Sequence, residues 1–312
     1  MQKEPNRILS EVNKVLLGKE DVTRRALAAF LAGGHILLND VPGVGKTTLA
    51  VAFSRALGLR YRRIQFTPDV LPSDIVGFTL YDRESGSFRY RPGALSGAQL
   101  VLGDEVNRTS AKTQSALLEA MEEGRVTVDG ETHPLAAPFC VIATQNEVGA
   151  AGTQPLPQAE LDRFLVELTI GYPGPEREVE MLRTHAAANP LDSVETVSSA
   201  EALLRMQREV SGVHMADTLL EYLVRLAAAS RERETLALGL SPRGTLAVSR
   251  MARAWAWLEG RTFVLPEDVL AVFADVAAHR LLLTGKARLE GRTGRTEAAA
   301  LLEAVPLPHR LK

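Results

Sequence analysis

Short apolar runs alternate with amphipathic stretches over the first half of the chain, from residue 1 to about 171. We predict strands in the apolar runs, at residues 35–38, 62–66, 100–102, 139–143 and 164–168. The stretches between them have helical spacing and lie at about 19–33, 46–57, 110–122 and 157–162. Continuous apolar strands separated by helices are typical of a sheet that is covered on both faces. The pattern therefore predicts an α/β fold with a parallel sheet.

The pattern changes after residues 171–175, where the sequence Gly-Tyr-Pro-Gly-Pro is typical of a linker. Beyond it, apolar residues recur at helical spacing and helix-start signals are frequent. Such signals indicate helices at about 198–210, 219–226, 241–258 and 266–279. We therefore expect a larger α/β domain over residues 1–172 and a smaller all-α domain over residues 173–312.

The composition is that of a globular protein, with 46% hydrophobic and 24% charged residues. The net charge of −2, from 36 basic and 38 acidic residues, creates no overall positive field that would favour DNA or anionic lipid. The longest mostly apolar stretch, residues 26–38, is shorter than the ~18–20 residues that span a bilayer, and the polar N-terminus does not have the pattern of a signal peptide. A single cysteine, Cys140, suits a reducing compartment. We expect a cytoplasmic protein without membrane insertion.

A glycine-bearing loop follows the first predicted strand and leads into a helix, which is the layout of a nucleotide phosphate-binding loop. Gly43 and Gly45 allow backbone N–H groups to approach phosphates closely. Lys46 can reach the β- and γ-phosphates, and Thr47 can place its hydroxyl on Mg²⁺. Asp40 stands where a glycine is usual, so its carboxylate must point away from the phosphates. The candidate nucleotide-binding residues are Asp40, Val41, Pro42, Gly43, Val44, Gly45, Lys46, Thr47 and Thr48.

Polar side chains follow two later apolar strands, those at residues 100–102 and 139–143. Asp104 and Glu105 end the strand at 100–102, where Asp104 can hold Mg²⁺ through water and Glu105 can orient the attacking water. Asn146 follows the run at 139–143, and its amide can contact the γ-phosphate, although asparagine is also a common turn residue. Functional groups of open α/β sheets gather at the carboxyl ends of strands. The pattern therefore predicts a magnesium-dependent nucleotide-hydrolysing site.

These residues resemble those of AAA+ ATPases and, among them, the MoxR family. The resemblance covers nearly the whole chain, and the matching blocks occur in the family's order. They are DVPGVGKTTLA, RIQFTPDVLPSDIVG, YRPGAL, LVLGDEVNRTSAKTQSALLEAMEEGRVTVDG, VIATQNE, PLPQAELDRFL and LSPRGTL. The resemblance implies a P-loop AAA+ domain followed by a helical lid domain, with ATP and Mg²⁺ as ligands.

The resemblance also implies roles for individual residues. Asn146 corresponds to sensor 1, and Arg163 corresponds to the arginine finger, which points into the ATP of a neighbouring subunit. Arg243 corresponds to sensor 2 on the lid, and we expect it to face the phosphate loop of its own chain across the linker. Gly18 lies where the family's N-terminal segment passes the adenine.

Simpler explanations remain for the two arginines. Arg163 can neutralise acidic neighbours at a solvated helix end. Arg243 can be an ordinary first-turn arginine, although the helix dipole disfavours a cation there, which argues for a phosphate partner. Glu147 departs from the family, where a proline is more usual. Residues 81–91 resemble the family's insert in the second helix, and residues 124–133 resemble the hairpin before sensor 1.

The resemblance implies a homo-oligomeric ring, expected to be a hexamer, that couples ATP hydrolysis to chaperone-like remodelling of a protein client, with a von Willebrand factor A domain protein as a possible partner. A nucleic-acid motor is one alternative, but the predicted hairpin carries two acids, one arginine and one histidine, too little positive charge to track phosphates. Arginines 60, 62 and 63 do cluster, but we expect their strand to lie inside the sheet. A metal-chelatase motor subunit and an ATP-binding switch with little turnover are further alternatives. Glu105 argues against the switch, which needs no water-activating carboxylate.

Overall fold

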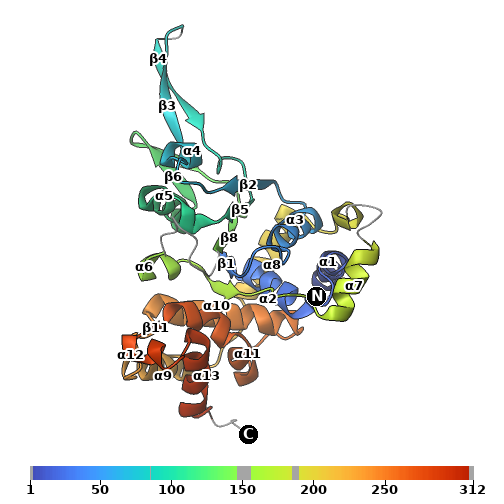
Figure 1. The fold of residues 1–312 in the computed structure, drawn as a ribbon, viewed down its shortest axis with the longest axis vertical. Coiled ribbons are helices and arrows are strands. Elements are labelled where there is room, and N and C mark those ends of the chain that lie inside the picture. The colour runs from blue at the N-terminus through green and yellow to red at the C-terminus, as the bar shows by residue number, and fades with distance from the viewer. Residues whose placement is uncertain (1–2, 85, 146–155, 185–189, 309–312) are drawn as a thin grey trace.

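The computed structural model describes residues 3–84, 86–145, 156–184 and 190–308 (Figure 1). Its centre is a five-stranded sheet in the order β2-β5-β8-β1-β9, in which every neighbouring pair is parallel. The strands are β1 (Ile36–Asn39), β2 (Tyr61–Gln65), β5 (Leu100–Asp104), β8 (Cys140–Gln145) and β9 (Val166–Leu168). The predicted parallel α/β sheet is confirmed, and each strand lies within a few residues of its predicted position.

Alternate residues of the strands pack against different helices. Ile36 and Leu38 of β1 belong to the core formed with the N-terminal helices, whereas Leu37 between them packs on the opposite face, against α5. Both faces of the sheet are therefore covered, as the apolar strand pattern predicts. The helices of this part are α1 (Lys3–Asn13), α2 (Glu20–Leu31), α3 (Lys46–Ala56), α4 (Pro72–Val76), η1 (Val106–Arg108), α5 (Ala111–Glu123) and α6 (Gln158–Leu161).

The edge strand β2 differs from the prediction. We expected the strand near arginines 60, 62 and 63 to lie inside the sheet, and this is wrong, since β5 is the one strand that pairs with β2 among the described residues. Of its five residues only Ile64 is buried, and Arg62 and Arg63 are exposed. An edge strand with charged side chains is a common way to prevent unwanted pairing of its free backbone groups.

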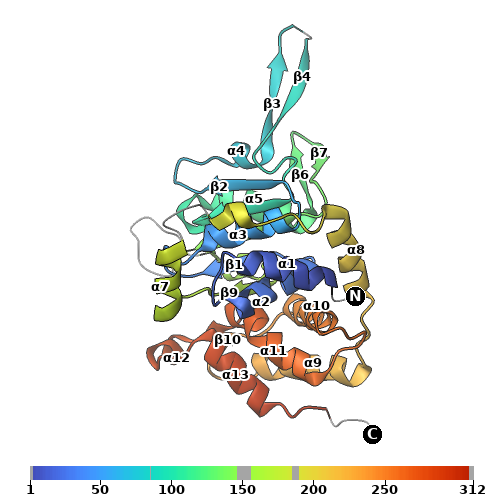
Figure 2. The same ribbon diagram turned by 90° about the vertical axis from the view of Figure 1, so that its right-hand side faces the viewer.

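Two antiparallel hairpins extend from the sheet domain. The first, β3 (Gly77–Asp82) with β4 (Ser87–Pro92), projects away from the body of the molecule (Figures 1 and 2). The second joins β6 (Arg125–Val128) to β7 (Glu131–Pro134) and lies beside its base. They coincide with the two segments, residues 81–91 and 124–133, that resemble the family's insert and hairpin.

The C-terminal part is helical, with one short two-stranded sheet. Its elements are α7 (Pro175–Thr184), η2 (Pro190–Ser193), α8 (Ala200–Ser211), α9 (Asp217–Arg231), β10 (Leu236–Leu238), α10 (Pro242–Leu258), α11 (Pro266–Ala277), η3 (Ala278–Arg280), β11 (Leu282–Leu283), α12 (Gly285–Leu289) and α13 (Gly294–Ala304). No helix among the described residues has both the length and the apolar composition needed to cross a lipid bilayer.

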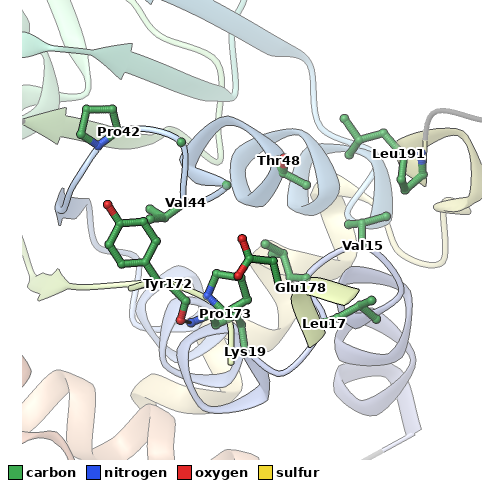
Figure 3. Close-up of a pocket in the computed structure, with 14 residues that line it drawn as sticks. Val15, Leu17, Lys19, Pro42, Val44, Thr48, Tyr172, Pro173, Glu178 and Leu191 are labelled. Carbon is green, nitrogen blue, oxygen red and sulfur yellow. Dashed lines mark hydrogen bonds between the residues drawn. The ribbon is translucent and has the colours of Figure 1, made fainter. Parts of the chain in front are cut away.

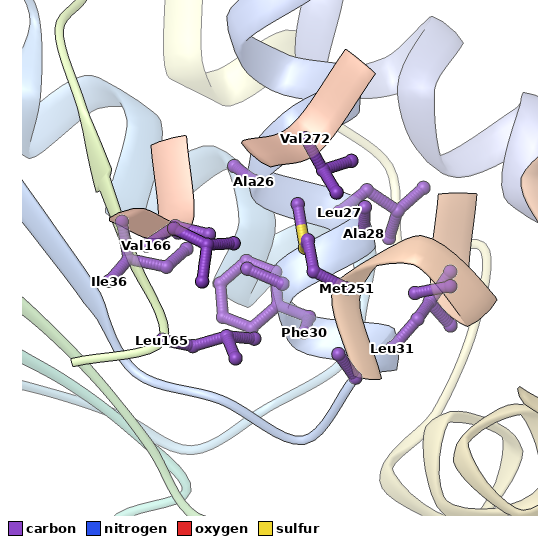
Figure 4. Close-up of a cluster of buried hydrophobic side chains, with 14 of the residues drawn as sticks. Ala26, Leu27, Ala28, Phe30, Leu31, Ile36, Leu165, Val166, Met251 and Val272 are labelled. Atoms are coloured by element: carbon purple, nitrogen blue, oxygen red, sulfur yellow. The ribbon is translucent and has the colours of Figure 1, made fainter. Parts of the chain in front are cut away.

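One continuous hydrophobic core contains residues from both sides of the expected domain boundary near residue 172. Met251 of α10 and Val272 of α11 pack with Phe30 and Leu27 of α2 (Figure 4). The short helix η2 also contacts the sheet domain, since the guanidinium of Arg55 on α3 donates to the carbonyl oxygen of Leu191. The lid helices are therefore packed firmly beneath the sheet on the side of α2 and β9.

The entry to β1 is held by a buried imidazole. Nδ1 of His35 accepts a hydrogen bond from the N–H of Val141 at 3.0 Å, and Nε2 lies 2.9 Å from the carbonyl oxygen of Met121. Since Nδ1 accepts, Nε2 carries the proton and donates it, so the ring is neutral. His35 therefore connects β1 to β8 and to the C-terminal end of α5.

Acid should weaken the fold through His35. Burial lowers the pKa of His35 from its ordinary value of 6.5 to about 4, so between these values the unfolded chain binds the proton more readily. The free energy of unfolding then falls as the pH is lowered through this window, and from pH 7 to pH 5 His35 alone accounts for about 2 kcal/mol. A His35→Asn variant should lack this part of the pH dependence in urea unfolding experiments. An equal loss in both proteins would contradict the assignment.

Candidate functional site

The loop between β1 and α3 has the backbone that its glycines predict. Gly43 has a φ of 85° and Gly45 has a φ of 98°, both in the left-handed region that favours glycine. Gly45 is also the residue before the first turn of α3, and an added Cβ there would lie 3.4 Å from Leu16 Cδ2. The N-terminal segment therefore lies close to the loop at Gly45.

The Asp40 carboxylate is directed at the end of β9. It is buried, and its Oδ2 accepts hydrogen bonds from the N–H groups of Ile170 at 2.6 Å and Gly171 at 2.8 Å. Its Oδ1 accepts from the N–H of Val41 at 2.9 Å. The residue that replaces the usual glycine thus fastens the start of the loop to the linker between the two parts of the chain.

Two cavities meet at this loop. The smaller, of about 370 Å³, is lined by loop residues together with both carboxylates of the predicted acidic pair. Its lining residues are Pro42, Gly43, Gly45, Lys46, Thr47, Thr48, Asp104 and Glu105. Lys46 is buried, and its Nζ donates to the carbonyl oxygen of Asp40 at 2.7 Å. The structure therefore brings the predicted cation, hydroxyl and carboxylates into one space.

The larger cavity, of about 640 Å³, lies between the N-terminal segment, the loop and the linker (Figure 3). Apolar side chains form much of its lining, which includes Val15, Leu17, Val44 and Leu191. Both the volume and this lining suit a small organic ligand. The two cavities share Pro42, Gly43, Gly45 and Thr48 and are therefore adjacent.

Gly18 belongs to the segment that borders this larger cavity. Its φ of 70° is left-handed, and an added Cβ would lie 3.2 Å from Arg177 Cγ. The next residue, Lys19, donates from Nζ to the carbonyl oxygens of Ile170 at 2.7 Å and Tyr172 at 2.8 Å. The turn at Gly18 therefore connects the N-terminal segment to the linker at the mouth of the cavity.

The acidic pair is held by Thr144, which sequence analysis missed. The Thr144 hydroxyl donates to Asp104 Oδ1 at 2.7 Å and accepts from the N–H of Glu105 at 2.9 Å. Thr144 is fully buried at the end of β8, next to β5. The signal that could have found Thr144 is its place directly after an apolar run, the same signal that points to Asn146. Asn146 itself lies outside the described residues.

Glu105 has a strained backbone. Its φ of 58° and ψ of 49° place it in the left-handed region, which for a residue other than glycine costs of order 1–3 kcal/mol. Its carboxylate Oε2 accepts from Arg108 at 2.8 Å and from Gln65 at 3.2 Å. Strain of this kind is concentrated at functional sites, where the surrounding structure maintains it. The position of Glu105 is thus specified by its neighbours.

Arg63 on the edge strand is a further contact that sequence analysis missed. Its guanidinium donates to Asp104 Oδ2 at 2.6 Å, and this hydrogen bond raises the pKa of Arg63. Because the strand of Arg63 was expected to lie inside the sheet, this contact with Asp104 was not predicted. Register explains it, because Arg63 stands opposite Leu102, two residues before Asp104, on the neighbouring strand.

Arg163 and Arg243 meet at a carboxylate outside both cavities. Arg163, between α6 and β9, lies 3.1 Å from Glu122 Oε2, and Arg243, at the start of α10, lies 2.8 Å from Glu122 Oε1. Neither arginine is among the residues that line the cavities at the loop. The role of Arg243 as sensor 2 stays a prediction, and in this structure its side chain lies beside Glu122. Because α10 packs against α2 beneath the sheet, Arg243 lies near Arg163 and the end of α5.

The sheet order, the glycine loop leading into α3 and the acidic pair on β5 together define a P-loop ATPase of the AAA class with a helical lid. Comparison with known proteins agrees. Residues 35–166 match the ATPase family associated with various cellular activities (AAA), and residues 228–303 match the AAA lid domain.

Full-length relatives narrow the assignment. The chain is 45% identical to the protein YeaC of Bacillus subtilis, over 96% of this chain and 93% of that protein. It is 38% identical to Chaperone MoxR1 of Mycobacterium tuberculosis, over 97% of this chain and 82% of that protein. A crystal structure from Cytophaga hutchinsonii superposes with a TM-score of 0.89 at 36% identity, covering 98% of this chain and 95% of that one. The chain belongs to the MoxR family of AAA+ ATPases.

Removing the Asp40 carboxylate should destabilise the protein. In Asp40→Ala the buried N–H groups of Ile170 and Gly171 lose their acceptor, and a loss of this kind costs about 3 kcal/mol. The measurement is the free energy of unfolding in urea. Asp21→Ala, which removes an exposed carboxylate paired with Arg25, is the control and should change stability by less than about 1 kcal/mol. Equal effects of the two substitutions would contradict the role of Asp40.

Proposed function

We propose that this protein hydrolyses ATP. The observation that carries the proposal is the single cavity lined by Lys46, Thr47, Asp104 and Glu105, adjacent to a larger and mostly apolar cavity. The apolar cavity suits the adenine, and Gly18 allows the N-terminal segment to pass beside it. The loop backbone and Lys46 suit the phosphates, because N–H groups at a helix N-terminus and a lysine cation bind anions.

Thr47 and Asp104 would hold Mg²⁺. Both present oxygen atoms to the smaller cavity, and oxygen ligands are those that magnesium prefers. Magnesium is commonly bound through one or two carboxylates together with substrate phosphates. The bound ion would supply neutralisation of charge on the phosphates.

Glu105 would orient and polarise the attacking water. A carboxylate in this role accepts a proton or a hydrogen bond from the water, and the positioning of such a base is worth about 10²–10⁴ in rate. The hydrogen bond between Thr144 and the N–H of Glu105 supports this role by fixing the backbone behind the side chain. A purely switch-like protein has no need of such an arrangement.

Arg163 and Arg243 would act on the ATP of a neighbouring subunit. They come together on Glu122, away from the cavities of their own chain. An arginine finger stabilises the charge that develops on the transferred phosphoryl group, and it can be supplied by another molecule. Hydrolysis then requires a homo-oligomeric ring, and the family resemblance favours a hexamer. This proposed role differs from the one expected from sequence, in which Arg243 serves the site of its own chain.

A protein client suits the surface better than nucleic acid does. The projecting β3–β4 hairpin exposes Phe78, Leu80, Tyr81 and Phe88, and apolar surface of this kind is typical of protein contacts. The β6–β7 hairpin offers little positive charge, since its Arg125 is paired with Glu123. One relative carries the name chaperone. We therefore propose remodelling or maturation of a protein client. The family resemblance suggests a von Willebrand factor A domain protein as one candidate partner.

Mixing two inactive variants tests the proposal. Glu105→Gln should bind ATP but hydrolyse it at least ~100-fold more slowly, and Arg163→Ala should lose about 10³-fold or more. In mixed rings, some interfaces join an intact Glu105 site to an intact Arg163 from the neighbour, so ATPase activity should return. The control is Lys46→Ala, which removes the phosphate-binding cation from the same site as Glu105 and should therefore not restore Glu105→Gln. Mixed rings without activity would overturn the role of Arg163 in trans.

A further inference from the structure

The carboxylate of Glu122 joins two parts of the chain that are distant in sequence. Its Oε2 lies 3.1 Å from a terminal nitrogen of Arg163, and its Oε1 lies 2.8 Å from a terminal nitrogen of Arg243. Each oxygen thus binds a different guanidinium. Without this carboxylate, two positive charges at neighbouring positions would repel each other and separate.

The charges at this contact are placed against their own helix dipoles. Glu122 lies in the last turn of α5, where the helix dipole disfavours an anion, and that turn contains no basic residue. Arg243 lies in the first turn of α10, which contains no acidic residue, where the dipole disfavours a cation. The side chains of both are more than two-fifths exposed, and exposed ion pairs contribute little to stability. Folding stability therefore does not explain the arrangement.

The backbones behind the two arginines are held firmly. Asp162, next to Arg163, accepts a hydrogen bond from the Ser241 hydroxyl at 2.8 Å and pairs with the buried Arg280 at 2.6 Å. Ser241 is the N-cap of α10, two residues before Arg243. On the other side, His35 holds the carbonyl oxygen of Met121, the residue before Glu122. Glu122 is then the contact that orients the two flexible side chains on this scaffold.

We propose that Glu122 is a positioning residue, which holds Arg163 and Arg243 together so that both reach the triphosphate of the neighbouring subunit as one unit. This inference rests on the proposed function. A guanidinium has five N–H donors, and Glu122 contacts one terminal nitrogen of each arginine. The same side chain can therefore be held by Glu122 while it donates to a phosphate.

The test begins with Glu122→Gln and the matched control Glu123→Gln. The amide of the first variant offers one oxygen and one N–H₂ group, so one arginine faces a donor and loses its partner. Misplacement of a catalytic group by about 1 Å costs on the order of 10² in rate. We expect kcat for ATP to fall about 10²-fold with unchanged nucleotide affinity. Glu123 contacts only Arg125 among the described ion pairs, and Glu123→Gln should retain kcat. Glu122→Asp, which keeps both oxygens on a shorter stem, should lie in between.

Mixing then locates the defect. Rings of Glu122→Gln with Glu105→Gln should regain activity, because Glu105→Gln supplies intact arginines to an intact site. Rings of Glu122→Gln with Arg163→Ala should stay inactive, because both variants damage the same side of the interface. A wild-type kcat for Glu122→Gln, or activity restored by Arg163→Ala, would overturn the inference. A further outcome is that mixing Glu122→Gln with Glu105→Gln fails to restore activity while mixing Arg163→Ala with Glu105→Gln succeeds. That outcome would overturn the role of Glu122 and leave the proposed function intact.

Discussion

The position of β1 between β8 and β9 is the constraint on which the rest of the site depends. Its two ends are fixed by side chains, because His35 accepts from the N–H of Val141 on β8 and Asp40 accepts from two N–H groups just beyond β9. The phosphate loop leaves β1 at the edge of the sheet where β5 presents its carboxylates and β8 presents Thr144. Parallel pairing brings these ends together. Without that register, Lys46 and Thr47 would not line the same cavity as the two carboxylates.

The same packing separates the molecule into two complementary faces. One face has the cavities with Lys46, Asp104 and Glu105, and the other has Arg163 and Arg243 gathered on Glu122. The lid helices share a core with α2 and β9. Arg243 therefore lies near α5 rather than near the phosphate loop of its own chain. A subunit of this shape offers a receiving site and a pair of arginines on different faces, which is what a ring with shared sites requires.

Much of the fold and the loop chemistry follows from sequence, because the strands are continuous apolar runs and the glycine-lysine loop has local conformational requirements. The hairpins and family membership also emerge from local sequence blocks. The contacts of Thr144 and Arg63 with Asp104 do not, since they depend on the order and register of strands far apart in the chain. The place of Arg243 depends on how the lid packs, and no local pattern encodes that direction. Glu122 has no local signal either, because its two partners lie 41 and 121 residues further along the chain.

The claim that a neighbour completes each site is tested most directly by ATPase activity measured against assembly. The rate per subunit is recorded from dilute to concentrated protein, and sedimentation in the same ATP-containing buffer gives the fraction that is assembled. The expected result is a rate per subunit that rises in proportion to the assembled fraction and is negligible for the monomer. A monomer that hydrolyses ATP as fast as the assembled protein would contradict the claim.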